Sequence, residues 1–317
     1  MTNVAAYVHG IYPRSEELVA ATRDLDRGRT TAEAVSDLYQ QDLAELVELQ
    51  RAAGLDFFTD GLLRWQDLFR PLVEASPGLS KGALVRWFDN NTFYRAPEEH
   101  SEIVFVGSLG SAYDTTSVVP EPRVATLPSP LLFSRIAVAR GSSNDLMREL
   151  ARGLLRPVAE RLVQQGYQVI QLQEPWLVFH GIDEQDWKHV EESVGIVTEG
   201  LGATTVLHTY FGDAAPWIDR LRDLPVDAVG VDFFETDVRS LGSGWTGGIL
   251  VGAMSGRRSN LESVDDIVGL ARMVGESTGA PSVFVSTISD LELLPRDLAA
   301  EKVRRLGAAA AKLREEA

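Results

Sequence analysis

Short apolar runs recur along the chain, and an amphipathic stretch follows most of them. The runs are nearly continuous in hydrophobic residues, which is typical of strands covered on both faces in a parallel sheet. The pattern predicts eight strands: AAYVHG (5–10), LDFFTDG (55–61), RVATLPSP (123–130), YQVIQLQEP (167–175), TTVLHTYF (204–211), AVGVDFF (228–234), GILVGAMSG (248–256) and SVFVSTIS (282–289).

The stretches between these runs have helical periodicity. Residues 30–54 place Val35, Tyr39 and Leu43 at four-residue intervals, on one helical stripe. Residues 142–166 repeat this pattern, and Pro157 predicts a kink within them. Strands alternating with helices predict the α/β class and a single (β/α)8 TIM barrel domain over residues 1–317.

One segment departs from the alternation of strand and helix. LVRWFDNNTFYRAPEEHSEIVFVGS (84–108) has two strand-like halves around an asparagine pair. We expect a β-hairpin arm over 84–108, inserted after the second strand.

The composition narrows the class of partner. The chain has 317 residues, of which 44% are hydrophobic and 24% charged, as in a globular protein. Its net charge of −16 disfavours binding to nucleic acid or to an anionic membrane surface. There is no signal-peptide pattern before residue 30 and no apolar run near the ~20 residues of a membrane span, so we expect a cytoplasmic protein with a small-molecule partner.

Polar side chains follow most of the predicted strands. In a barrel the active site lies where the strands end, so these side chains are expected to meet around one pocket. They are His9, Asp60, Gln173, Glu174, His208, Asp232 with Glu235 just beyond, Ser286 and Ser289.

In these segments the chain resembles the cobalamin-independent methionine synthase family, in its shorter form with one catalytic barrel. The family belongs to one superfamily with uroporphyrinogen decarboxylase. The resemblance covers nearly the whole chain through motifs in a constant order: HGIYPRSEEL (9–18), AGLDFFTDGLLRWQDLF (53–69), NNTFYRAP (90–97), GYQVIQLQEPWL (166–177), LHTYFGD (207–213) and VSTISDLELLPRDLAAEKVRRL (285–306). It implies a barrel that transfers a methyl group.

The family resemblance also implies a zinc ion, held by a histidine, two cysteines and an acid. His208 stands at the histidine position, but Tyr210 and Ser289 stand at the cysteine positions, and the acid falls at or near Asp232. The chain has no cysteine, so the two-cysteine zinc site cannot form. A different divalent metal on His208, Asp232 or Glu235 stays open, because imidazole and carboxylate suit Fe(II), Mn or Zn.

The positions that hold homocysteine in the family have changed as well. Ile11, Leu62 and Gln173 stand where the resemblance implies a serine, a glutamate and an aspartate. Each lost charged partner costs ~3–5 kcal/mol. Homocysteine is therefore not the expected substrate.

Two sets of residues carry the remaining site predictions. The candidate catalytic residues are His208, Glu174, Asp60 and Tyr210, as acids, bases or hydrogen-bond donors. The candidate substrate-binding residues are His9, Tyr12, Arg14, Arg64, Gln173, Trp176 and Arg95. For each of these residues a structural or surface role remains an alternative.

Several functions fit these predictions. The first is transfer of a methyl group from a folate or corrinoid donor to an acceptor other than homocysteine. The second is a metal-independent lyase or decarboxylase of the uroporphyrinogen-decarboxylase type, in which arginines hold carboxylates. A non-catalytic binding barrel and retained methionine synthase activity are the other two.

Overall fold

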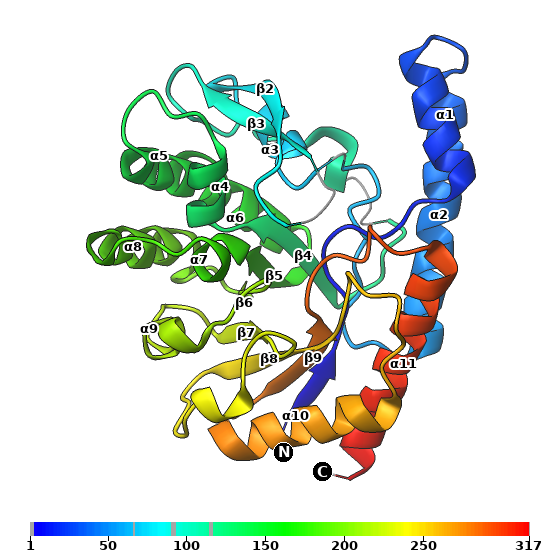
Figure 1. Ribbon diagram of the computed structural model, residues 1–317. Helices are drawn as coiled ribbons and strands as arrows, with labels where there is room; N and C mark the ends of the chain where they lie inside the picture. Colours follow the sequence, from blue (N-terminus) through cyan, green and yellow to red (C-terminus); the bar gives the residue numbers. More distant parts are fainter. Residues whose placement is uncertain (1–2, 66, 90–92, 114–116, 317) are drawn as a thin grey trace.

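The computed structural model describes residues 3–65, 67–89, 93–113 and 117–316. Seven parallel strands form its main sheet, in the order β1-β9-β8-β7-β6-β5-β4. The sheet curls through the middle of the molecule with helices around it (Figure 1). Its strands are β1 (Val4–Ala6), β4 (Arg123–Pro128), β5 (Tyr167–Gln173), β6 (Thr204–His208), β7 (Ala228–Asp232), β8 (Gly248–Met254) and β9 (Val283–Thr287). These are seven of the eight predicted strands, in the expected α/β class.

The predicted second strand, 55–61, is the exception. Only Phe58 forms a β-bridge, to Arg123. The segment still joins the two edge strands, since the Asp56 amide donates to the Ala6 carbonyl (2.9 Å) and the Phe58 amide to the Pro122 carbonyl (2.8 Å). Within the segment, the Gln50 side chain accepts from the Thr59 amide and donates to the Thr59 carbonyl, each at 2.9 Å. This side chain satisfies the backbone groups that a longer strand would have paired.

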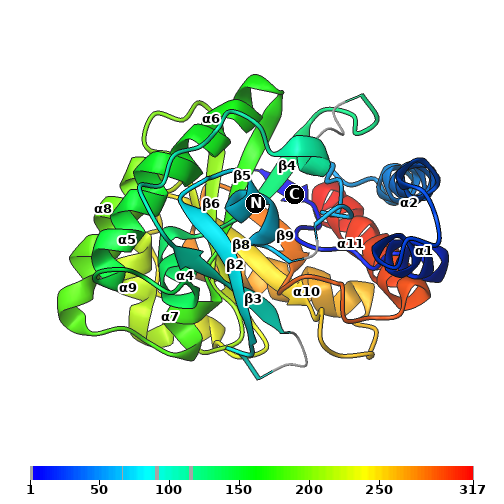
Figure 2. The ribbon, with the colours of Figure 1, turned by 90° about the horizontal axis from the view of Figure 1, so that it is seen from above.

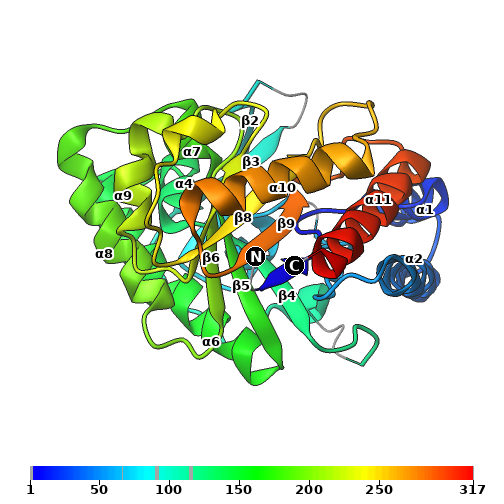
Figure 3. The ribbon, with the colours of Figure 1, turned by 90° about the horizontal axis from the view of Figure 1, so that it is seen from below.

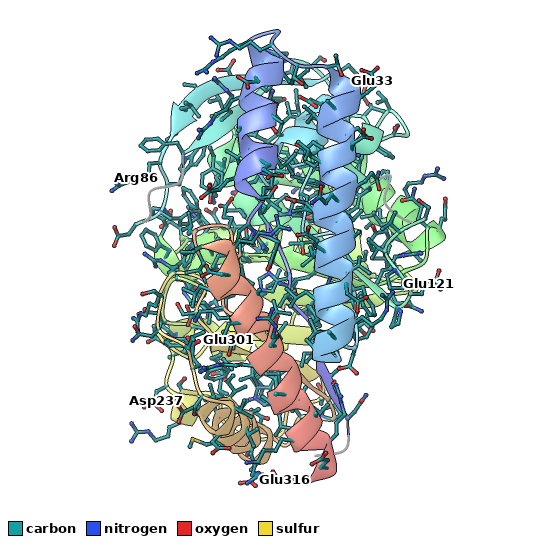
Figure 4. All side chains as sticks on the ribbon, turned by 90° about the vertical axis from the view of Figure 1, so that its right-hand side faces the viewer. Glu33, Arg86, Glu121, Asp237, Glu301 and Glu316 are labelled. Carbon is teal, nitrogen blue, oxygen red and sulfur yellow. The ribbon has the colours of Figure 1, made fainter. Side chains whose placement is uncertain are left out.

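Helices cover the outer side of the sheet (Figures 1 and 3). They are α1 (Glu16–Asp26), α2 (Ala32–Ala53), α3 (Arg70–Glu74), α4 (Pro130–Ile136), α5 (Ser143–Leu150), α6 (Arg156–Gln164), α7 (Pro175–Phe179), α8 (Trp187–Thr198), α9 (Ile218–Arg222), α10 (Val264–Thr278) and α11 (Arg296–Glu315), with short turns η1 (Gly110–Tyr113), η3 (Glu184–Asp186), η4 (Ala215–Trp217) and η5 (Val238–Ser240). Figure 4 shows α1, α2 and α11 together on the face that carries Glu33 and Glu301. Within the described residues, no helix has the length and apolar character that a bilayer crossing requires.

The local sequence accounts for where two of these helices begin, end or break. Thr31 caps the first turn of α2 by accepting from the Ala34 amide, and Gly54 ends α2 in the left-handed conformation. The predicted kink near Pro157 appears as a π-helical turn, η2 (Ala151–Leu155), between α5 and α6. Proline has no amide to donate, and the carbonyl of Gly153 instead accepts from the Phe105 amide at 2.8 Å.

The predicted β-hairpin arm at 84–108 is not confirmed, and the strands of this region have other bounds. An antiparallel pair is formed by β2 (Leu79–Val85) and β3 (Tyr94–Glu99). Residues 101–108, the last part of the predicted arm, carry no strand. The asparagine pair lies outside the described residues. Seen from above, β2 and β3 lie across the sheet (Figure 2).

Inside the curled sheet, side chains stack in layers. Six of the strands, β4 to β9, contribute one side chain each to an apolar layer, and Tyr7, which directly follows β1, completes it. The layer consists of Tyr7, Val124, Val169, Val206, Ala228, Leu250 and Phe284. Because alternate residues of a strand point to the same face, the positions two residues further on form the next layer. That layer contains His9, Gln171 and His208, and it is the floor of the candidate site.

Candidate active site at the carboxyl ends of the strands

His208 ends β6, and its ring lies against β7. It is fully buried and in register with Gln173 of β5 and Gly230 of β7. A Cβ atom at Gly230 would come within 2.5 Å of the His208 ring. Gly230 therefore provides the space that lets this ring lie inside the sheet.

The imidazole of His208 is neutral in these surroundings. Its Nδ1 lies 3.2 Å from Nε2 of Gln171, and its ring centre lies 4.9 Å from that of His9. Burial, and secondarily the neighbouring His9, hold the pKa of His208 well below its usual value. Its Nε2 is buried without a hydrogen-bond partner among the described residues.

His9 connects β9 to Gln173. Its Nε2 lies 3.1 Å from the Thr287 carbonyl, and its Nδ1 lies 3.3 Å from Nε2 of Gln173. A carbonyl only accepts and this amide nitrogen only donates, so the contacts assign the proton to Nε2. Burial lowers the pKa of His9 to about 4, which keeps this neutral form at ordinary pH.

Gln173 links three strand ends through its side-chain amide. Its Oε1 accepts a hydrogen bond from the Tyr210 hydroxyl at 2.9 Å, and its Nε2 donates to Oδ1 of Asp290 at 2.7 Å. Gly10 leaves room for this contact, because a Cβ there would come within 1.5 Å of Oδ1 of Asp290. The predicted residues His9, Gln173, His208 and Tyr210 therefore lie together.

A largely apolar pocket adjoins this network and shares Gln173, Tyr210 and Asp290 with it. Its polar lining comes from Gln173, Tyr210 and the segment after β9. Phe88, which follows β2, and Tyr94, the first residue of β3, contribute to its aromatic wall. The lining consists of Ile11, Leu68, Phe69, Phe88, Tyr94, Leu132, Ile136, Gln173, Pro175, Tyr210, Phe211, Ser289, Asp290, Glu292 and Leu293. Apolar walls with a few convergent polar groups are typical of small-molecule sites.

Two carboxylates in this lining, Asp290 and Glu292, were missed by the sequence analysis. Burial raises the pKa of Asp290 to about 6. Burial raises the pKa of Glu292 to about 8, and the nearby charge of Asp290 adds to the effect. The sequence did contain a signal, because ISDLE (288–292) overlaps and continues the predicted strand 282–289. Of its five residues, only Ser289 was among the expected site residues.

Glu174 lies beside the pocket as a helix cap. Its carboxylate accepts from the Leu177 amide at 2.9 Å and the Leu132 amide at 3.2 Å, and it also bonds the Ser129 hydroxyl. Burial raises the pKa of Glu174 to about 7, although these hydrogen bonds act to lower it. These contacts fix the first turns of α7 and α4, and Glu174 does not line the pocket.

Asp60, Arg64 and Arg95 also lie outside the pocket lining. Asp60 accepts from the Leu62 amide at 2.9 Å. Arg64 lies 4.7 Å from the ring centre of Tyr39 on α2, and Arg95 donates to the Gly82 carbonyl at 3.1 Å. The substrate-binding roles expected for the two arginines therefore stay predictions.

The remaining substrate-binding candidates lie at the edges of the pocket. Tyr12 and Arg14 line a neighbouring cavity, which shares Ile11 and Glu292 with the first. Trp176 contacts His180, with ring centres 4.1 Å apart and ring planes tilted by 34°. Their proposed roles stay predictions.

The predicted metal ligands do not form a metal site. Both oxygens of Asp232 accept backbone hydrogen bonds, from Phe234 at 2.9 Å and Phe211 at 3.3 Å. Glu235 lies exposed, 4.0 Å from Arg258. Among the described residues, no three histidine or acidic side chains are grouped as a metal site requires. These residues therefore do not fit the zinc ion that the family resemblance implied.

A curled parallel sheet with a pocket at the carboxyl ends of its strands is the arrangement of the β/α-barrel enzymes. The family described as "Cobalamin-independent synthase, N-terminal domain" matches residues 78–259, more than half of the chain. The chain belongs to this family.

Proteins whose sequences match most of this chain have names related to that family. A methionine synthase of Sulfurisphaera tokodaii is 23% identical over 93% of this chain and 88% of its own length. The 5-methyltetrahydropteroyltriglutamate–homocysteine methyltransferase of Neisseria gonorrhoeae is 28% identical over 69% of this chain, but over only 29% of its own length. The family description, cobalamin-independent, overturns the corrinoid, which was one of the two expected methyl donors beside a folate.

Solved structures show the same fold. A B12-independent methionine synthase from Shewanella sp. W3-18-1 superposes with a TM-score of 0.78 over 99% of this chain and 98% of its own, at 17% identity. A putative vitamin-B12-independent methionine synthase from Listeria monocytogenes has a TM-score of 0.77 at 16% identity. These likenesses confirm the predicted barrel-type architecture.

Proposed function

We propose that this chain is a methyltransferase that moves a methyl group from a methyltetrahydropteroyl donor to a small acceptor other than homocysteine. The donor class is supported by the name of the Neisseria gonorrhoeae relative. We place the reaction in the pocket, because the side chains of Gln173, Tyr210 and Asp290 converge there. This convergence is the observation that carries the proposal.

Three features support a change of acceptor. Ile11 and Gln173 line the pocket at positions where the family resemblance implied polar or charged contacts to homocysteine. Gln173 already bonds Tyr210 and Asp290, so its amide is engaged within the protein. Tyr210 and Ser289 occupy the positions of the two metal-binding cysteines and provide no thiolate for zinc.

Methyl transfer needs a nucleophile that has lost its proton and a donor nitrogen that gains one. Asp290 lines the pocket with a carboxylate that can accept the acceptor's proton, whereas Asp60 and Glu174 lie outside the lining. Tyr210 has a pKa well above its usual range because it is buried, so its hydroxyl stays protonated as a hydrogen-bond donor. These residues orient the acceptor and move its proton.

Aromatic side chains at the edge of the pocket suit a flat pterin. The ring of Trp176 lies against that of His180 at a tilt of 34°, and the ring of His180 lies 5.8 Å from that of Phe88, which lines the pocket. His180 is fixed by its contact with the Trp87 carbonyl at 2.8 Å. The alternative of a lyase gains no comparable support, because no arginine belongs to the described lining.

The test is an activity assay with 5-methyltetrahydropteroyl mono- and triglutamate as donors. Homocysteine is offered with and without added zinc, and both methionine and demethylated donor are measured. We expect no methionine in either case, and donor demethylation with other small acceptors. Methionine formation at a catalytic rate would overturn the proposed change of acceptor and establish retained methionine synthase activity.

A further inference from the structure

The charges in the pocket lining all have one sign. Asp290 and Glu292 lie at one side, while Phe69, Phe88 and Phe211 are part of the apolar wall. The described lining contains no lysine, arginine or histidine. An anionic ligand would meet no cation in this lining, whereas a cation would meet the Asp290 carboxylate and aromatic faces, and its charge would favour the ionised form of Glu292.

Glu292 has spare bonding capacity. Within the described part of the chain, its carboxylate accepts no hydrogen bond and forms no ion pair within 4.0 Å. The charged groups that act on it are Asp290, Arg14 and Asp67. The Asp67 carboxylate is turned to the backbone, where it accepts from the amides of Phe69 and Arg70 at 2.8 and 2.7 Å. Glu292 is therefore free to bind a group in the pocket.

Asp290, by contrast, is held in place. Gln173 donates to one of its oxygens at 2.7 Å, and the Tyr210 hydroxyl and His9 fix the Gln173 amide in turn. A fixed carboxylate beside a free one, next to an aromatic wall, is suited to a positively charged group on an apolar body. Aromatic faces attract such a cation within ~6 Å of the ring centre.

We infer that the pocket takes a small apolar amine, whose ammonium group binds between Asp290 and Glu292. The inference rests on the proposed function, because it names the class of acceptor for that same pocket. It assigns Glu292, which has no counterpart among the predicted site residues, a role in selecting the substrate. An amino acid is disfavoured, since its carboxylate would find no cation in the lining.

The transfer step balances as follows. The ammonium gives one proton to the Asp290 carboxylate, and the nitrogen lone pair then forms a bond to the methyl carbon. The bond from that carbon to the donor nitrogen breaks, its electron pair stays on the donor nitrogen, and this nitrogen takes the proton from Asp290. The products are the methylated ammonium and the demethylated donor.

Equilibrium binding to the full chain tests the inference without the donor. The probe is phenethylamine, compared with 2-phenylethanol and 3-phenylpropionate as neutral and anionic analogues of similar size. We expect the amine to bind at least about tenfold more tightly than either, a factor that one charge-assisted contact supplies. Equal or tighter binding of 3-phenylpropionate would overturn the inference.

Two variants locate the contact. Glu292→Gln and Asp290→Asn are each expected to weaken phenethylamine about tenfold and to leave 2-phenylethanol within about twofold. Glu149→Gln, on the exposed surface of α5, removes the same charge away from the pocket and should change neither. Unchanged amine binding in both pocket variants, with folding confirmed by circular dichroism, would refute the assignment.

The two proposals fail in different ways. If amines bind but no acceptor demethylates the donor, the methyltransferase function is wrong and the amine site stands. If donor demethylation occurs with a non-amine acceptor while phenethylamine does not bind, the function stands and the amine site is wrong.

Discussion

The hydroxyl of Tyr210 donates a hydrogen bond to Oε1 of Gln173 at 2.9 Å, and both side chains are buried. In the family resemblance these two positions belong to a cysteine that binds metal and an aspartate that binds substrate. In this chain the two side chains form a neutral pair, and Gln173 also donates to Asp290. A hydrogen-bond network centred on Gln173 therefore holds the Asp290 carboxylate at the pocket.

Tyr210→Phe should destabilise the protein. It leaves Oε1 of Gln173 buried without its donor, at a cost of about 1–2 kcal/mol in the free energy of unfolding. Urea denaturation measures this. Tyr7→Phe is the matched control, because the Tyr7 hydroxyl is buried without a hydrogen-bond partner in the described residues. The control should be neutral or stabilising; a loss of equal size in both variants would contradict the role given to the Tyr210 hydroxyl.

Gly10→Ala should displace the Asp290 carboxylate. Gly10 has a φ of 71°, and its Cβ would overlap Oδ1 of Asp290, whereas Gly279 has a φ of 67° with no atom within 4 Å of its Cβ. Both substitutions carry the strain of a left-handed alanine, about 1 kcal/mol. We expect the Gly10 variant to lose more stability and at least about tenfold in phenethylamine affinity. Calorimetry measures both; identical behaviour of the two variants would contradict the close approach.

Glu174 should make stability depend on pH. Burial raises its pKa from the ordinary 4.5 to about 7, so between these values the folded state binds a proton that the unfolded state has lost. The stabilising contribution is present below pH 4.5 and is lost as the pH rises through 7, in total up to about 3 kcal/mol.

The measurement is urea denaturation of the wild type and Glu174→Gln at several pH values. The difference between them isolates Glu174 from His9, whose lowered pKa acts in the opposite direction. A difference in unfolding free energy that stays constant from pH 4.5 to 7.5 would show that Glu174 is charged throughout.

Zinc retention should be weak. After incubation with zinc and desalting, the wild type is expected to retain well below one equivalent, because His208 has no further ligands grouped around it in the described residues. Tyr210→Cys with Ser289→Cys adds two thiolates to the pocket and should raise retention. Stoichiometric zinc in the wild type that is lost in His208→Ala would contradict the prediction.

The apolar periodicity was sufficient to predict seven of the sheet strands and the long helices. It failed at 55–61, where the side chain of Gln50 on α2 forms hydrogen bonds with the amide and the carbonyl of Thr59. It also misplaced the bounds of the β2–β3 pair, whose first strand begins five residues before the predicted arm. In both places, contacts formed only on folding decide which backbone groups pair.

The sequence by itself determined the order of strands, the absence of thiolate ligands and the presence of His9, Gln173, His208 and Tyr210 at strand ends. These properties follow from residue type and spacing along the chain. Only the tertiary structure decided that Glu174 caps two helices and that Asp290 and Glu292 line the pocket. The direction of a side chain beyond a strand end depends on the loop backbone and its neighbours, and no periodicity encodes that.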